Sequence, residues 1–181
     1  MMRRLNGSFA FSSIFVRWQA AVLLAAGMVL GGCDAAPGED RAAAGFTARV
    51  TGAVEAELEG RALFATIRKD GADVFGLQLQ AHDAVPYVLV SLERGIAARP
   101  APGAYPVVGQ AAGADPAAFA ATYTRSQEDP FFFEPFHATG GTLVVTRSDA
   151  GRLAGSVTFT ADAGGGRVIE VSAVFDAAPG R

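Results

Sequence analysis

Hydrophobic and polar residues alternate along most of the chain after residue 45. Residues 46–58 keep a period of two, and so do residues 63–67 and 75–79. A period of two buries one face of an extended segment and leaves the other face in water, which indicates β-strands. The last two of these runs flank Asp70 and Gly71. Asp-Gly between alternating runs predicts a tight β-hairpin.

Further extended segments are predicted along the rest of the chain. Residues 86–92 are apolar on both faces, as a central strand requires. Three more alternating segments, at residues 142–146, 153–161 and 167–175, are separated by short glycine-containing turns. Turns every 8–12 residues favour an all-β fold. We therefore expect an antiparallel β-sandwich or barrel of about 8–9 short strands, and the pattern leaves the choice between sandwich and barrel open.

The first 32 residues have a different pattern. Arg3, Arg4 and Arg17 make the start basic, and an apolar run follows at residues 20–30. That run is about half the length of roughly 20 residues that a membrane-spanning helix needs. A basic start, a short apolar run and small residues at its end are typical of a secretory signal peptide.

The end of this segment, Leu30-Gly31-Gly32-Cys33, resembles the lipobox of bacterial lipoproteins. The resemblance implies cleavage before Cys33 and lipidation of its sulfur, with the membrane as a partner through that lipid. It divides the chain into a lipoprotein signal peptide (1–32), the lipidated cysteine with a flexible tether (33–45) and an all-β domain (46–181). The domain would face the periplasm or the cell exterior from the cell membrane or the outer membrane.

A second resemblance covers the C-terminal strands. The segments at residues 141–146, 153–161 and 171–175 are similar to the last strands of uncharacterised bacterial lipoproteins that have a β-sandwich domain. That group supplies no catalytic residues to transfer to this chain.

Charge and cysteine content narrow the function classes. After cleavage the chain keeps 12 Lys and Arg against 18 Asp and Glu, a net charge of −6. This balance argues against a nucleic-acid partner, which requires clustered basic residues. Cys33 is the only cysteine, so no internal disulfide is expected.

Residues with catalytic potential are few. The common nucleophile, zinc-protease, phosphate-binding and dithiol motifs are absent. His82 and His137 are the only imidazoles, and Glu134 lies three residues before His137. These three residues are weak candidate metal ligands, because further ligands would have to come from elsewhere in the fold. We expect no catalytic residue, no metal and no cofactor.

An aromatic cluster is the most unusual feature of the domain. Phe131, Phe132 and Phe133 are consecutive, and Phe136 follows. Alternation cannot place three consecutive aromatic residues on one face of a strand. Either they close one end of the core, or they form an exposed loop that contacts a ligand, a partner or the membrane.

Three functional hypotheses follow. The first is a non-catalytic, lipid-anchored binding or assembly module of the cell envelope, with an envelope protein as partner and the aromatic cluster as contact. The second is a metal-assisted hydrolase that uses His82, His137 and nearby carboxylates. The third is a carrier of a small apolar ligand, which requires an interior cavity.

Overall fold

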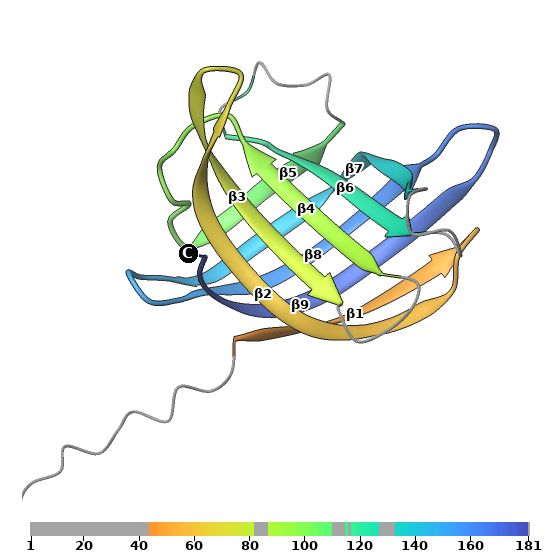
Figure 1. Ribbon diagram of the computed structural model, residues 1–181, viewed down its shortest axis with the longest axis horizontal. Helices are drawn as coiled ribbons and strands as arrows, with labels where there is room; N and C mark the ends of the chain where they lie inside the picture. The colour runs from red at the N-terminus through yellow and green to blue at the C-terminus, as the bar shows by residue number, and fades with distance from the viewer. Residues whose placement is uncertain (1–43, 82–86, 110–114, 116, 127–132, 181) are drawn as a thin grey trace, which may run out of the picture. The chain divides into compact units, whose positions relative to one another are not determined.

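The described part of the chain forms nine β-strands (Figure 1). The computed structural model describes residues 44–81, 87–109, 115, 117–126 and 133–180. The strands are β1 (Gly45–Gly52), β2 (Ala56–Lys69), β3 (Ala72–Ala81), β4 (Val88–Arg94), β5 (Gly103–Val108), β6 (Phe119–Ser126), β7 (Phe133–Ser148), β8 (Leu153–Asp162) and β9 (Val168–Pro179). In the described part of the chain there is no helix with the length and apolar character needed to cross a bilayer.

The nine strands form one closed barrel. Their order around it is β1-β2-β3-β4-β6-β5-β7-β8-β9, and β1 pairs with β9 to complete the ring. Most neighbours are antiparallel, but two short contacts are parallel: Leu63 of β2 lies opposite Ala178 of β9, and Val107 of β5 opposite Phe119 of β6. The predicted all-β class is confirmed, the closed sheet is a barrel, and these two contacts make it mixed.

Several strands differ from the predicted pattern. β2 has 14 residues and β7 has 16, so not all strands are short. The alternating run at residues 46–58 is two strands, because the chain turns after Gly52. Gly52 has a φ of +104°, and a Cβ there would lie 2.5 Å from the carbonyl oxygen of Val168. Both features require glycine at this position. The alternation of apolar and polar residues continues across the turn, so the pattern alone did not divide the run into two strands.

The hairpin predicted at Asp70-Gly71 is confirmed. β2 and β3 pair from Arg61–Gln80 to Lys69–Ala72, and the two turn residues have φ values of 50° and 83°. Positive φ at both central residues matches a two-residue turn whose twist suits the flanking strands.

The barrel has two ends, which we call proximal and distal. The proximal end carries the β2–β3 turn and the β7–β8 turn around Asp149. At the distal end β1, β3, β6 and β8 finish, at Gly52, Ala81, Ser126 and Asp162. Gly45, where β1 begins, lies in one row with Asp176, Ala154 and Arg147 on one side. On the other side its neighbour Phe46 pairs with Gly60, which packs against Ala81 at the end of β3.

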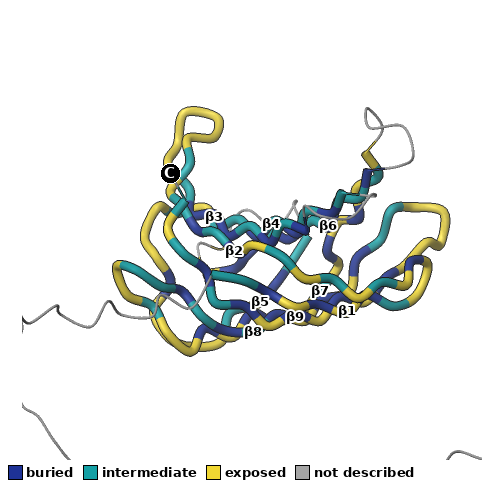
Figure 2. Tube along the Cα trace, turned by 60° about the horizontal axis from the view of Figure 1, so that its bottom comes forward, coloured by how far each residue is buried: buried dark blue, intermediate teal, exposed yellow. Residues whose placement is uncertain are grey.

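Buried residues lie along the strands (dark blue in Figure 2), and their apolar side chains form one core cluster. Leu77, Leu92, Tyr123, Phe136 and Leu143, from four different strands, expose none of their surface. A space large enough for water would appear as exposed surface on the side chains beside it. The described core is therefore solid at these positions, and its burial supplies the main favourable term in folding.

Two adjacent glycines in β7 differ sharply in their surroundings. A Cβ on Gly141 would lie 2.3 Å from the Thr158 carbonyl oxygen and 2.5 Å from the Phe159 Cβ, whereas nothing lies within 4 Å of the Cβ position of Gly140. The close approach of β8 to β7 therefore depends on Gly141.

This contrast predicts the effects of two matched substitutions. Gly141→Ala should destabilise the barrel by about 2 kcal/mol or more, because backbone atoms of β8 must move. Gly140→Ala should change stability by no more than about 0.5 kcal/mol. Urea unfolding of both variants measures the difference, and equal midpoints would contradict the contact.

Candidate functional site

The candidate residues named from the sequence fall into two groups. Cys33, His82, Phe131 and Phe132 lie outside the described residues. The others lie at the start of β7, at the distal end: Phe133, Glu134, Phe136 and His137. The structure therefore describes only the second group.

The two described phenylalanines have opposite environments. Phe136 is fully buried, whereas the side chain of Phe133 is 54% exposed. Both belong to β7, where alternate residues point inward and outward. Of the two alternatives for the aromatic cluster, Phe136 therefore follows the first, as a core residue, and Phe133 is the described aromatic residue that faces solvent.

Glu134 and His137 do not converge. Glu134 shares the inward face of β7 with Phe136, and His137 lies on the exposed outer face. The carboxylate of Glu134 accepts two hydrogen bonds from the guanidinium of Arg167, one of them 3.2 Å long from Nη2 to Oε2. Among the described residues, no three His, Cys, Asp or Glu side chains are close enough to hold a metal ion.

Around Phe136 the distal end holds an aromatic and charged cluster. The ring of Tyr123 meets the ring of Phe136 edge to face, with centroids 5.8 Å apart and an interplanar angle of 77°. The guanidinium of Arg167 lies 5.5 Å from the Phe136 centroid while it binds Glu134. A cation over an aromatic face is attracted by the ring's negative charge density. Arg167 therefore joins the β8–β9 turn to the start of β7.

The hydroxyl group of Tyr123 is buried without a hydrogen-bond partner among the described residues. It lies in a core cluster that otherwise contains Ala, Val, Leu, Ile and Phe. Burial raises the pKa of this phenol above its ordinary value of 10.0, and the positive charge of Arg125 opposes that rise. A buried polar group without a partner costs about 1–3 kcal/mol. Phenylalanine, which keeps the ring and lacks the hydroxyl group, would avoid that cost.

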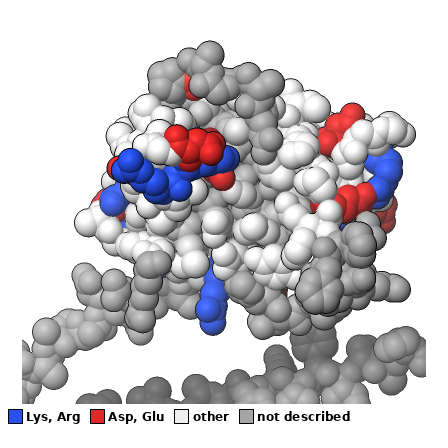
Figure 3. Space-filling model, turned by 45° about the horizontal axis from the view of Figure 1, so that its top comes forward, with Lys and Arg blue, Asp and Glu red and all other residues white. Residues whose placement is uncertain are grey.

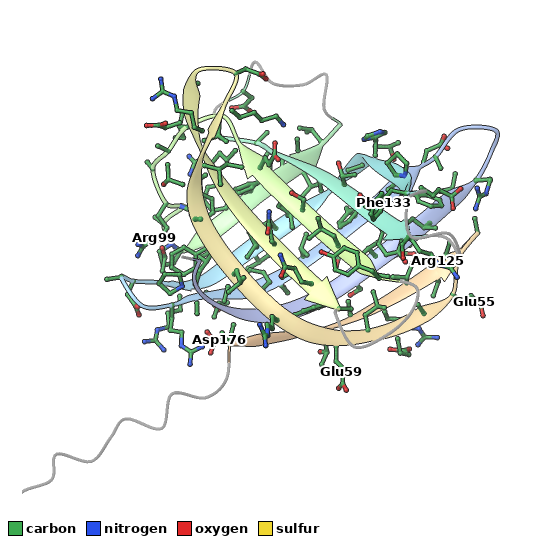
Figure 4. All side chains as sticks on the ribbon, in the orientation of Figure 1. Glu55, Glu59, Arg99, Arg125, Phe133 and Asp176 are labelled. Atoms are coloured by element: carbon green, nitrogen blue, oxygen red, sulfur yellow. The ribbon has the colours of Figure 1, made fainter. Side chains whose placement is uncertain are left out.

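Arg125 lies at the distal end of β6, as Figure 4 shows. It follows Tyr123 by two residues and pairs in register with Val88 of β4 and with Glu134 of β7. The alternation of β6 assigns it to the inward face, and it is half-buried. Among the described residues it forms no hydrogen bond or ion pair, because the carboxylate opposite it is bound by Arg167.

The proximal end has a comparable arrangement with different partners. Arg99 lies 4.9 Å from the Phe64 ring and donates to the carbonyl oxygen of Asp149. Arg94 lies 5.3 Å from the Tyr105 ring and 5.9 Å from that of Phe119. Arginines therefore cover aromatic side chains at both ends, and at the proximal end these guanidiniums have partners.

An open groove lies where β1 begins. Its volume is about 830 Å³, with Phe46, Leu58 and Phe175 among its apolar lining and Glu57, Glu59 and Asp176 among its acidic lining. Glu57 pairs with Arg49 at 3.5 Å and Asp176 with Arg152 at 3.6 Å.

Figure 3 shows another face, on which charged side chains of both signs gather mainly in two groups with mostly uncharged atoms between them.

Sequence reasoning missed Tyr123, Arg125 and Arg167 as members of one cluster. The period of β6 contained a usable signal, because it assigns Tyr123 and Arg125 to one face. No local signal joins Arg167 to Glu134, which lies 33 residues away in sequence.

Comparison with known proteins adds no relative. No family model, curated protein or solved structure shows a significant match to the chain.

The environment of Tyr123 predicts the pH dependence of stability at high pH. Because its folded-state pKa is raised, the native state keeps a proton that the unfolded state loses above about pH 10. Stability should therefore fall as the pH rises above that value, and Tyr123→Phe should reduce this fall. The difference in phenolate absorbance between the wild-type chain and Tyr123→Phe should show the Tyr123 phenol ionising above about pH 10 in the native state. Ionisation of Tyr123 at or below that pH would contradict the burial.

Proposed function

We propose that the mature chain is a lipid-anchored lipoprotein of the cell envelope, whose barrel is a non-catalytic binding or assembly module. The anchor rests on the lipobox at Leu30–Cys33. Two or more acyl chains on Cys33 would hold the chain stably at a membrane, since a single chain binds only marginally.

The observation that carries the binding role is the exposure of Phe133 at the distal end, where 54% of its surface is accessible to solvent. β1 begins at Gly45, twelve residues after Cys33. An aromatic side chain that is exposed on an anchored barrel is placed where a partner in the envelope can contact it.

Replacement of Cys33 tests the anchor. Cys33→Ser should abolish incorporation of labelled fatty acid and shift the protein from the membrane fraction to the soluble fraction after cell disruption. Because Cys33 is the only cysteine, no other thiol can accept the diacylglyceryl group. A wild-type chain that takes up no label would reject the lipoprotein assignment.

Site-specific photo-crosslinking tests the contact. A photoreactive phenylalanine analogue at position 133 should give a defined adduct with an envelope protein in intact cells. The same analogue at Val174, which is 63% exposed on the outer face of β9, is the matched control and should not give this adduct. Absence of an adduct at 133, or an identical adduct at both positions, would remove Phe133 as the contact.

A further inference from the structure

Arg125 is a half-buried cation without a counter-charge among the described residues. Its register partner Glu134 is the nearest carboxylate in the ladder, but that carboxylate is held by both terminal nitrogens of Arg167. Of Arg125, Arg167 and Glu134, only Arg125 therefore has no partner of opposite charge among the described residues. A positive charge removed from water without a partner favours an anionic group beside it.

The second unpartnered group at this end is the hydroxyl of Tyr123. It is fully buried, accepts and donates no hydrogen bond among the described residues, and lies on the same face of β6 as Arg125. The side chains of Phe136 and Val90, which pair in register with Tyr123, offer it no hydrogen-bond partner. A ligand oxygen held by Arg125 would supply the missing acceptor.

From these two groups we propose that the distal end of the barrel binds a small organic carboxylate, with Arg125 as its cationic partner and the Tyr123 hydroxyl as a hydrogen-bond donor. The inference extends the proposed binding role by naming a class of ligand, and it does not depend on the lipid anchor.

The surroundings set the charge and size of the ligand. One uncompensated guanidinium matches a monoanion, and a neutral phenol donates to carboxylate oxygen readily. Val88 and Phe136 make the neighbourhood apolar. Beneath Tyr123 the core is solid, because Ala121 and Val90 have no exposed surface. The apolar part of the ligand must therefore be short and remain near the distal end.

Reaching the hydroxyl requires a side chain to move, because the oxygen itself is covered. No hydrogen bond or ion pair to a described residue holds the side chain of Arg125 in place, and its long stem has several rotamers. A change of rotamer would bring the guanidinium onto a carboxylate that binds beside the phenol.

The experiment titrates hexanoate, hexanol and hexylammonium into the chain that starts at Asp34. The described barrel closes without any residue before Gly45, so this chain retains every strand. Amide NMR shifts should report saturable binding of hexanoate, centred on β6 and the start of β7. Hexanol and hexylammonium, with the same number of carbon atoms, should bind at least about tenfold more weakly, because each lacks the anion.

Variants separate a specific site from general attraction of an anion to the surface. Arg125→Gln should weaken hexanoate binding at least about tenfold, the size of a lost charged hydrogen bond. Tyr123→Phe should weaken it several-fold without lowering the melting temperature of the free protein. Arg99→Gln, at the proximal end, is the matched control and should leave binding unchanged.

Several outcomes would overturn the proposal: no saturable binding of hexanoate, equal binding of hexanol or hexylammonium, or equal affinity in Arg125→Gln. If Arg125→Gln fails to fold, Arg125→Lys keeps the charge but loses the fork of donors, and should bind with intermediate affinity. Failure here leaves lipidation of Cys33 and crosslinking at position 133 unchanged, so the two proposals can fail separately.

Discussion

Closure of the sheet by β1 is the constraint on which the rest of the structure depends. β1 forms eight register pairs with β9 and five with β2, and it places Phe46, Ala48 and Val50 in the core. Without this strand, β2 and β9 would touch only through their short parallel contact at Leu63 and Phe64. Two long strand edges would then be open, and open edges invite pairing with other chains. β1 is also the strand nearest the proposed anchor, so an anchored chain would be tethered through the strand that closes its barrel.

Much of the fold could be predicted from local pattern, because each strand buries one face. The Asp70-Gly71 hairpin and the strands of the C-terminal third followed from alternation and turn chemistry alone. The closed ring did not, since nothing in β1 or β9 shows that they meet across more than 100 residues. The extra length of β7 was missed for a related reason: its first part pairs with β6 and its later part with β5. Which strands pair with β7 depends on the order of strands around the barrel, and the sequence of β7 itself contains no signal of it.

The candidate site shows the same division. Once residue 133 is known to lie in a strand, alternation alone places Phe133 and Phe136 on opposite faces. The run of consecutive aromatic residues gave no indication of where that strand begins. Glu134 and His137 looked like a pair at a spacing of three residues, and a strand sends such residues to opposite faces. Position within an extended segment, more than closeness in sequence, decides which side chains meet. The binding of Glu134 by Arg167 follows from the topology, which brings the β8–β9 turn over the start of β7.

The ends of a solid barrel are where its polar groups must be satisfied, because the interior accepts only apolar side chains. At the proximal end, Arg99 rests on Phe64 and donates to the carbonyl oxygen of Asp149, so its charge is stabilised within the chain. At the distal end, Arg167 has the same kind of arrangement over Phe136 with Glu134. Arg125 and Tyr123 break this symmetry: the described residues give them neither an anion nor an acceptor. Phenylalanine in place of Tyr123 and a neutral residue in place of Arg125 would serve packing better. Their presence together on one face of β6 therefore points to recognition of a molecule outside the chain.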